Sequence, residues 1–359
     1  MRKNAEHNYF QQALKRIDRN LGKLVPAKFT QQWQREWVDE ASARDMRLLT
    51  AAVSRPAREL LFHPGKRWRP LFGILMLEMM GVRPQPYELL LAALTEVSHT
   101  GALIIDDIED NAQLRRGRAC IHERYGLAAG INVANTLYFL PFAVIARHKK
   151  LSHRQKSDIY AIMARQFIRA HLGQAADLNW QGRIRQLWKQ KNIEALILQA
   201  YADKSGAVVE GVCEIAAVIA GCSKKQCRQA ADFGRSFGIA YQIIDDILDL
   251  RGFPGKHRPA GEDILDAKLT SVLLYSLRNL ASVHQVQLLG ILSDSRLRVT
   301  PKGKREAVRL IRQSGGPEYA LSVARNIYHA AGQKFFPMFK KTDVRLRLDR
   351  LCDRLLQIR

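Results

Sequence analysis

Two short acidic segments repeat nearly the same seven residues at widely separated places in the chain. They are Ile104–Asp110, with the sequence IIDDIED, and Ile243–Asp249, with the sequence IIDDILD. On a helix of 3.6 residues per turn, the aspartates of the pattern DDxxD share one face, where their charges repel unless a cation neutralises them. Facing carboxylates suit hard divalent ions, chiefly Mg²⁺, which takes its other ligands from water and substrate phosphates. The repeat therefore predicts metal ions that connect acidic helices to a diphosphate.

A solvated helix face or a helix cap is the simpler explanation of this motif, and for a single copy we would prefer it. Here each copy directly follows an apolar run, so its carboxylates project from a helix that is otherwise buried. Chance also seldom repeats seven positions so closely. The metal ligands predicted from the two copies are Asp106, Asp107, Asp110, Asp245, Asp246 and Asp249.

Two short segments of the sequence are rich in cations. Gly65–Pro70 (GKRWRP) places three cations in four residues at an expected helix start, and Leu114–Gly117 (LRRG) follows the first aspartate motif. A helix N-terminus and arginine side chains together form an anion site. A solvated basic patch explains the first segment equally well, and a salt-bridge network explains the second without any ligand.

The elements that must position these groups are helices. Apolar residues recur at intervals of three and four almost everywhere, and strand-like alternation is nearly absent, which predicts an all-α fold. Several segments are apolar on more than one face, as expected in a large bundle rather than a thin one. Without a Ser/Pro-rich linker, we expect one domain, with peripheral helices over residues 1–60 and a catalytic core over 65–280.

Composition narrows the class of partner. The 359 residues include 57 Lys and Arg against 34 Asp and Glu, a net charge of +23, which predicts a polyanionic partner. The cations are spread along the chain and match no nucleic-acid-binding module, so we expect no nucleic acid; diphosphates or peripheral contact with an anionic membrane fit the charge. Five cysteines without a CxxC pair predict reduced thiols, and the N-terminus has no apolar signal core, so we expect a cytoplasmic protein.

A membrane-spanning helix is not expected from the longest apolar stretch. That stretch runs from Leu137 to Ala146, contains Pro141, and is shorter than the roughly 20 residues that a span needs.

The motifs in combination resemble the trans-isoprenyl diphosphate synthases, also called polyprenyl synthetases. The resemblance covers roughly Gly65 to Leu277 and follows the order GKRxRP, His99, DDxxD, RRG, Lys204-Ser205-Gly206, Gln242, DDxxD and Lys268. The string HTGALIIDDIEDNAQLRRG is most similar to geranylgeranyl diphosphate synthases of the eukaryotic type. The resemblance implies a single large bundle of mostly antiparallel helices around a deep central cavity, and it implies a homodimer, the common state of the family.

The resemblance also implies the reaction. Isopentenyl diphosphate would add head-to-tail to an allylic diphosphate after Mg²⁺-assisted ionisation, with three Mg²⁺ per active site, for which Mn²⁺ can substitute. The released diphosphate would then remove the proton, so that no protein base is required.

The family's site residues are carried over by motif. The allylic diphosphate would contact Arg115, Lys204, Lys256 and Lys268, and isopentenyl diphosphate would contact Lys66, Arg67, His99 and Arg116. The carbocation would face Lys204, Ser205 and Gln242. Two positions depart from the family pattern: Ser205 replaces threonine, and Ala267 replaces the glycine before Lys268.

Product length should depend on the residues below the first aspartate motif. Gly101 and Ala102 are small, so a growing tail can pass them, whereas Tyr138, Phe139 and His171 resemble the floor of a cavity that admits a C20 product. The last three fit equally well as ordinary core residues. We therefore expect geranylgeranyl diphosphate, with farnesyl or longer-chain polyprenyl diphosphate as alternatives.

Two other classes of protein compete with this interpretation. A class I terpene cyclase also ionises allylic diphosphates, but its second metal motif is typically an Asn/Ser/Glu triad, and it has no use for the second diphosphate site that GKRxRP supplies. A regulatory subunit of a heteromeric prenyl synthase generally loses one aspartate motif, whereas both are intact here.

Overall fold

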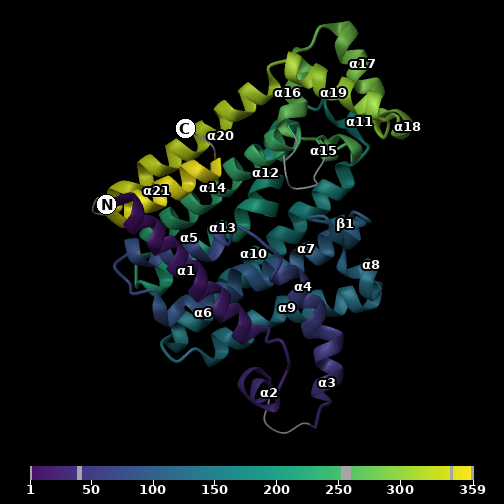
Figure 1. Ribbon diagram of the computed structural model, residues 1–359. Coiled ribbons are helices and arrows are strands. Elements are labelled where there is room, and N and C mark those ends of the chain that lie inside the picture. The colour runs from purple at the N-terminus through teal and green to yellow at the C-terminus, as the bar shows by residue number, and fades with distance from the viewer. Residues whose placement is uncertain (1, 39–42, 252–259, 340–342, 357–359) are drawn as a thin grey trace. The chain divides into compact units, whose positions relative to one another are not determined.

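The computed structural model describes residues 2–38, 43–251, 260–339 and 343–356 (Figure 1). The described residues are almost entirely helical, which confirms the all-α prediction. They form two compact units. Unit 1 comprises Met1–Ile162, Ile215–Cys222 and Lys341–Leu348, and unit 2 comprises Met163–Glu214, Ser223–Lys340 and Asp349–Arg359. The single-domain organisation and the central cavity stay predictions.

Unit 1 contains the first aspartate motif and the GKRWRP segment. Its elements in chain order are α1 (Arg2–Leu24), α2 (Gln31–Trp37), α3 (Met46–Leu49), the π-helix η1 (Thr50–Ser54), α4 (Arg55–Leu61), α5 (Trp68–Met79), the 3-10 turn η2 (Gln85–Tyr87), α6 (Glu88–Ala92), the π-helix η3 (Ala93–Val97), α7 (Ser98–Glu109), β1 (Leu114–Arg115), β2 (Arg118–Ala119), α8 (Ile121–Tyr125) and α9 (Leu127–Arg147).

Unit 2 contains the second aspartate motif and the Lys204-Ser205-Gly206 segment. Its elements are α11 (Ile184–Leu187), α12 (Ile193–Tyr201), the π-helix η4 (Ala202–Gly206), α14 (Lys224–Asp249), α15 (Glu262–Leu265), α16 (Ser271–Asn279), α17 (Ser282–Ser293), α18 (Ser295–Arg298), α19 (Pro301–Gln313), α20 (Gly316–Phe335) and the 3-10 turn η5 (Phe336–Met338). Residues of α10 (His153–Trp180), α13 (Ala207–Ile219) and α21 (Asp343–Leu356) belong to both units.

The core of unit 1 begins earlier in the chain than residue 65. On α1, Ile17, Leu21 and Leu24 recur at helical spacing and are fully buried, because this helix packs against α5 and α6. The N-terminal helix therefore contributes to the core rather than only covering it.

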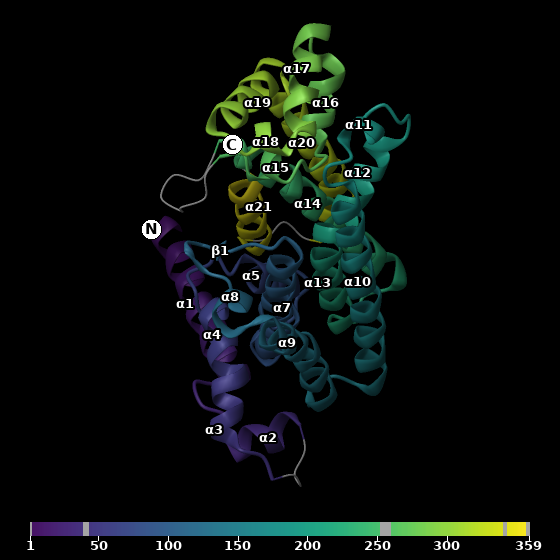
Figure 2. The same ribbon diagram turned by 90° about the vertical axis from the view of Figure 1, so that its right-hand side faces the viewer.

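The core of unit 2 centres on α14 and α20, which lie side by side (Figures 1 and 2). Phe233 of α14 stacks on Phe335 of α20 with ring centroids 4.4 Å apart, and both rings are fully buried. Ser223 and Gln226 form a capping box that begins α14. This long helix ends at the second aspartate motif, so its packing determines where those carboxylates lie.

The sequence did not predict the short hairpin of β1 and β2, which pair antiparallel in unit 1. Arg116 and Gly117 form its two-residue turn with φ values of 54° and 78°, as a type I′ turn requires. The hairpin places Arg115 on a strand and Arg116 in the turn.

Among the described residues, two helical stretches are long and apolar enough to cross a membrane by length and composition alone. They are Gln85–Glu109, whose window is 72% buried, and Leu127–Arg147, whose window is 44% buried. The length argument made from Leu137 to Ala146 is therefore wrong, because α9 continues as a helix through Pro141. The high burial of the first stretch is typical of a core helix in a soluble protein.

Candidate active site

In unit 1, the hairpin brings Arg115 onto the first two aspartates of the motif. The Arg115 guanidinium donates from Nη2 to Asp106 Oδ2 at 2.9 Å and from Nε to Asp107 Oδ1 at 2.6 Å. Asp110 is the C-cap of α7, one turn further along the same helix. The acidic motif and one of the predicted diphosphate-binding arginines thus form one cluster.

Asp107 has one oxygen that Arg115 does not bind. Its side chain is 1% exposed, and its second oxygen, Oδ2, is buried and accepts no hydrogen bond from a nitrogen or oxygen donor, although the Cys120 thiol lies close to this carboxyl. Burial raises the pKa of this carboxyl, which the neighbouring Arg115 opposes. A buried, unpaired carboxylate oxygen is costly, so the arrangement fits a bound cation.

No group of three or more His, Cys, Asp or Glu side chains in the described part of the chain is arranged to hold a metal ion unaided. Mg²⁺ does not require such a cage, because it binds through one or two carboxylates together with waters and substrate phosphates. The aspartates therefore fit Mg²⁺ that arrives with a diphosphate.

Arg67 was predicted to bind isopentenyl diphosphate, but its guanidinium points into the protein. It donates to Glu96 at 2.9 Å, to Asp18 at 3.2 Å and to the Leu61 carbonyl, and the side chain is 9% exposed. Its backbone has φ 47°, a left-handed N-cap conformation that turns the side chain away from the helix start. We correct its role to anchoring the start of α5.

The sequence analysis missed Arg69, two residues further on. Its guanidinium lies over the Trp68 ring at 4.6 Å, and its Nε is buried without a hydrogen-bond partner. The charge of Arg69 lowers the pKa of His99 and of Arg116, so these three side chains lie close together. His99 and Arg116 are two of the residues predicted to bind isopentenyl diphosphate. The place of Arg69 in the first turn of α5, just after the cations Lys66 and Arg67, was the available signal.

His99 is neutral in this cationic surrounding. Burial, followed by the charges of Arg69, Arg116 and Arg115, lowers its pKa well below the ordinary value. Arg116 is also affected: burial and then Arg115 lower the pKa of its guanidinium, which donates to the Pro64 carbonyl at 3.5 Å. Several cations close together are expected where an anion binds, and Lys66 is exposed at the same helix entry.

The depressed pKa of His99 predicts an acid-dependent loss of stability. Below pH about 6.5 the unfolded chain protonates this histidine and the folded protein does not, so stability falls as pH falls. Between pH 7 and pH 5 the contribution should reach up to about 2 kcal/mol. Urea unfolding at both pH values should show a smaller loss in His99→Gln than in the wild type; equal losses would contradict the assignment.

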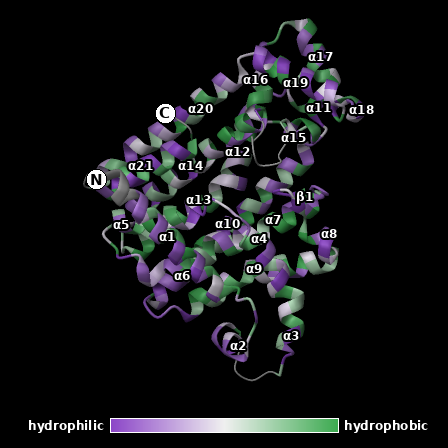
Figure 3. Ribbon diagram, viewed as in Figure 1, coloured by the Kyte–Doolittle hydropathy of each residue, from purple (hydrophilic) through white to green (hydrophobic). Residues whose placement is uncertain are grey.

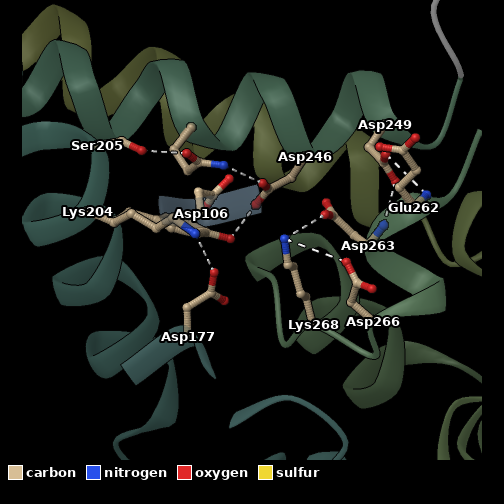
Figure 4. Close-up of polar contacts among 12 residues, drawn as sticks. Asp106, Asp177, Lys204, Ser205, Asp246, Asp249, Glu262, Asp263, Asp266 and Lys268 are labelled. Carbon is tan, nitrogen blue, oxygen red and sulfur yellow. Dashed lines mark hydrogen bonds and ion pairs between the residues drawn. The ribbon is translucent and has the colours of Figure 1, made fainter. Parts of the chain in front are cut away.

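In unit 2, the π-helix η4 carries the predicted Lys204 and Ser205 (Figure 4). Lys204 Nζ donates to Asp177 Oδ2 at 2.7 Å, an acidic partner on α10 that the sequence analysis missed. The Ser205 hydroxyl donates to Gln242 Oε1, and Gln242 Nε2 donates to Asp246 Oδ1 at 2.9 Å. The structure therefore joins Ser205, Gln242 and the second aspartate motif in one chain of hydrogen bonds.

Arg169 of α10 holds η4 in place. Its Nε donates to Asp203 Oδ1 at 2.7 Å and its Nη1 to Glu210 Oε2 at 2.6 Å, while Gln199 donates to the other Asp203 oxygen at 2.8 Å. π-Helical turns are costly and often occur at functional sites. The bonds to Asp203 fix the turn that immediately precedes Lys204.

Glycines allow η4 to contact two helices through its backbone. A Cβ at Gly173 of α10 would lie 2.5 Å from the Lys204 nitrogen, and a Cβ at Gly238 of α14 would lie 2.5 Å from the Gly206 Cα. Both distances are shorter than real Cβ contacts, so larger residues would move η4. These two positions were not identified from the sequence as site residues.

Replacing Gly238 with Ala is expected to lower the free energy of unfolding by about 1–3 kcal/mol and to reduce turnover, because α14 must move away from Ser205. Gly290 on α17 is the matched control, since nothing lies within 4 Å of its Cβ position. Gly290→Ala should leave stability unchanged or raise it by up to about 1 kcal/mol. Urea unfolding and steady-state rates of both variants test this, and similar behaviour of the two would contradict it.

The aspartates of the second motif differ in their surroundings. Burial, and then the charge of Asp263, raises the pKa of Asp246 well above its usual range, and both of its oxygens accept hydrogen bonds, from Gln242 and from the Tyr201 hydroxyl. Asp249 is 2% exposed, and its oxygens accept from the backbone nitrogens of Glu262 and Asp263 at 3.2 Å.

Asp249 therefore caps the start of α15 in the described structure, and its metal contact stays a prediction. Asp245 is half-buried, which leaves it the most accessible aspartate of this motif.

Lys268 follows α15 and faces two acids. Its Nζ lies 3.7 Å from Asp263 Oδ1 and 3.8 Å from Asp266 Oδ2 (Figure 4). Ala267 has φ 49°, a conformation that favours glycine, in agreement with the family's glycine at this position. Lys256, also predicted to bind the allylic diphosphate, lies outside the described residues.

The predicted chain-length residues do not share one environment. Gly101 faces α9 rather than open space: its Cβ position is 2.8 Å from the Ala134 carbonyl oxygen and 3.5 Å from the Tyr138 ring. Its small size is thus required by helix packing. Tyr138 lies near the acidic end of α7, where burial and then Glu109 and Asp106 raise its pKa to about 12.

Phe139 and His171 are exposed in the chain, Phe139 to 69%. Neither is a buried core residue, so the alternative that they are ordinary core residues is wrong for these two. Their place in the floor of a cavity stays a prediction. Ala102 is half-buried, as a small side chain beside a cavity would be.

Comparisons with known proteins identify the family. Residues 50–309 match the family model "Polyprenyl synthetase". The chain belongs to the polyprenyl synthetase family. The chain is 30% identical over 277 residues to a geranylfarnesyl diphosphate synthase of Aeropyrum pernix, covering 76% of this chain and 83% of that protein.

Two further relatives show the range of the family. An octaprenyl diphosphate synthase of Haemophilus influenzae is 29% identical over 250 residues, 68% of each chain. The crystal structure of a geranylgeranyl pyrophosphate synthetase from Pyrococcus horikoshii Ot3 matches the fold with a TM-score of 0.81 at 23% identity, covering 99% of both chains. These relatives make products of different length, so membership of this trans-isoprenyl diphosphate synthase family establishes the transferase class and not the product.

Proposed function

We propose that this polyprenyl synthetase makes geranylgeranyl diphosphate from isopentenyl diphosphate and a shorter allylic diphosphate. The observation that carries the proposal is the cluster of Asp106, Asp107 and Arg115, in which a buried carboxylate oxygen has no hydrogen-bond partner. Such an oxygen beside a fixed cation suits a metal-bound diphosphate.

Asp106 and Asp107 in unit 1 and Asp245 in unit 2 would hold Mg²⁺, for which Mn²⁺ would substitute. When bound, Mg²⁺ supplies positive charge that stabilises the departing diphosphate. Arg115 in unit 1 and Lys204 in unit 2 would each donate to diphosphate oxygens. Removing the metal with a chelator should abolish turnover, and added Mg²⁺ should restore it.

The second substrate would bind among the cations of unit 1. Lys66, Arg69, Arg116 and neutral His99 would supply several donors, which suits a diphosphate that needs no metal. Isopentenyl diphosphate would then bind at the entry of α5, with Arg67 as a structural residue rather than a ligand.

The chain's own dipoles would stabilise the carbocation. The oxygens of Ser205 and Gln242 are fixed relative to each other by their hydrogen bond, and η4 is fixed by Arg169. Preorganised dipoles of this kind stabilise developing charge without reorganisation during the reaction. No described basic side chain is needed to remove the final proton, which would go to the released diphosphate.

The C20 product is supported by Ala102, which is small and half-buried one turn before Asp106, and by Tyr138 beside α7. A longer product is the second candidate, because relatives of this chain include geranylfarnesyl and octaprenyl diphosphate synthases. Tyr138→Ala should lengthen the product if this ring limits the tail.

A homodimer is supported by exposed apolar side chains on two long helices. Ile131 and Phe139 on α9 are 38% and 69% exposed, and Ile168 and Leu172 on α10 are 61% and 62% exposed. Exposed apolar side chains on each helix are typical of interfaces between subunits. Sedimentation of the wild type should give twice the chain mass, and Phe139→Asp should weaken the association.

The decisive experiment supplies the purified protein with Mg²⁺, isopentenyl diphosphate and, separately, dimethylallyl, geranyl or farnesyl diphosphate, followed by mass analysis. A C20 diphosphate that is lost in Asp106→Ala and in Asp245→Ala is the expected result. A longer product would overturn the C20 assignment and keep the reaction. A folded protein that elongates no primer would instead be a regulatory subunit.

A further inference from the structure

The helices α17, α18 and α19 of unit 2 pack against one another (Figures 1 and 2). Several of their apolar side chains are exposed to solvent. Val283 and Val286 on α17 are 73% and 68% exposed, and Leu297 and Val299 at α18 are 47% and 61% exposed. The opposite side of α17 is buried through Leu288 and its neighbours, so the exposed valines are not needed for the core.

The same helices carry a strong positive charge. Residues 282–313 contain seven Lys and Arg but only two acids, a net charge of +5, and no aromatic residue. Lys302 and Arg305 are exposed on the outer side of α19, and the side chains of Arg296 and Arg309 are 89% and 52% exposed. Polar and apolar residues alternate along these helices in Figure 3.

Both acids of this segment are already neutralised. Asp294 pairs with Arg296 at 3.2 Å, and Glu306 pairs with Arg309 at 2.7 Å. Within the described part of the chain, no acid pairs with Lys302 or Arg305. The outward charge of the segment is therefore available to an external anion.

The valines and the cations belong to one continuous surface. Gln287, on the exposed side of α17 beside Val283 and Val286, donates to Glu306 Oε1 on α19 at 2.9 Å. Glu306 lies one residue from Arg305 and one helical turn from Lys302. We call this surface, made by Val283, Val286, Leu297, Val299, Arg296, Lys302 and Arg305, the α17–α19 surface.

We propose that the α17–α19 surface binds the surface of an anionic lipid bilayer. Small apolar side chains that project beside long cations match the boundary between acyl chains and charged headgroups, where valines insert and Lys and Arg reach the phosphates. A nucleic acid fits less well, because the segment offers no aromatic ring on which bases could stack. Binding would hold the enzyme where membrane lipids take up its apolar product.

Vesicle sedimentation of the full-length protein tests the proposal. The wild type should bind vesicles of phosphatidylcholine with about one-third phosphatidylglycerol and should not bind pure phosphatidylcholine. Lys302→Gln/Arg305→Gln should weaken binding about 25-fold, from about 5-fold for each charge near the surface. Val283→Ser/Val286→Ser should weaken it about 10-fold, because apolar area no longer enters the bilayer.

Matched controls separate this surface from net charge and from apolar exposure in general. Lys224 and Lys225 are exposed at the start of α14 in the same unit, and Leu48 is 64% exposed in unit 1. Lys224→Gln/Lys225→Gln and Leu48→Ser should bind as the wild type does. Equal losses in these controls, or wild-type binding to neither vesicle, would overturn the proposal.

Two further outcomes would also overturn it. Unchanged binding of the valine variant would show a purely electrostatic contact. A smaller oligomer of that variant on a sizing column would show that another copy of the chain covers the surface. None of the substituted residues belongs to the proposed reaction, so the test is independent of turnover.

Discussion

Replacing Asp107 with Asn is expected to lower kcat/KM by about 10³-fold or more while the protein stays folded. The carboxylate is 1% exposed and burial raises its pKa, so keeping it charged without a ligand costs free energy that Arg115 and the Cys120 thiol offset only in part. Its Oδ2 has no hydrogen-bond partner and would complete the coordination of a metal-bound diphosphate. An effect of several kcal/mol on the transition state corresponds to this loss in rate.

Asn at this position keeps the size of the side chain and can still accept a hydrogen bond from Arg115. Removing a buried charge also removes its desolvation cost, so the free energy of unfolding should change by less than about 1 kcal/mol. Steady-state kinetics with varied Mg²⁺, together with urea unfolding, measures both quantities. Wild-type turnover, or inactivity caused by unfolding, would contradict the prediction.

Asp249 provides the matched control, because it is equally buried and occupies the last position of the other aspartate motif. Its oxygens cap the backbone of α15, so Asp249→Ala should lower the free energy of unfolding by about 1–2 kcal/mol. Its loss of activity should be smaller than that of Asp107→Asn. The two variants thus separate metal binding from helix capping within one repeated motif.

The helices were predictable because their signals are local. Each signal involves residues that are close in sequence. Examples are the three- and four-residue spacing of apolar residues, the aspartates on one face of α7, and the capping residues Ser223 and Gln226. The hairpin was not predicted, because only Gly117 favours the positive φ of its turn, whereas Arg116 adopts φ 54° without the Asn, Asp or Gly that is typical of a type I′ turn. Its flanking strands are two residues each and too short to show alternation.

The missed features depend on contacts that are distant in sequence. Gly101 is small because the carbonyl of Ala134 lies against it, and Gly173 is small because the backbone of Lys204 does. Asp177 became a site residue only when α10 placed it beside Lys204. The spacing of residues within one helix does not indicate which helix packs against it. Such residues can therefore be assigned to the site only after the packing is known.

The choice between Arg67 and Arg69 shows the same limit and gives the second prediction. Both arginines lie in the segment GKRWRP, and residue type alone favours neither. The left-handed backbone at residue 67 directs its side chain inward to Glu96, whose side chain is 10% exposed. Arg69 instead keeps a buried Nε without a partner and faces His99 and Arg116.

Arg69→Gln is therefore expected to raise KM for isopentenyl diphosphate by about 10²-fold, the value of a lost charge-assisted hydrogen bond, with KM for the allylic substrate and stability little changed. Arg67→Gln should lower the free energy of unfolding by about 3–5 kcal/mol, because it leaves Glu96 as an unpaired buried charge. The double variant Arg67→Gln/Glu96→Gln should recover part of that stability. KM for each substrate and urea unfolding of all three variants decide between the two arginines. A large increase in KM for isopentenyl diphosphate in a stable Arg67→Gln protein would restore Arg67 as the substrate-binding residue.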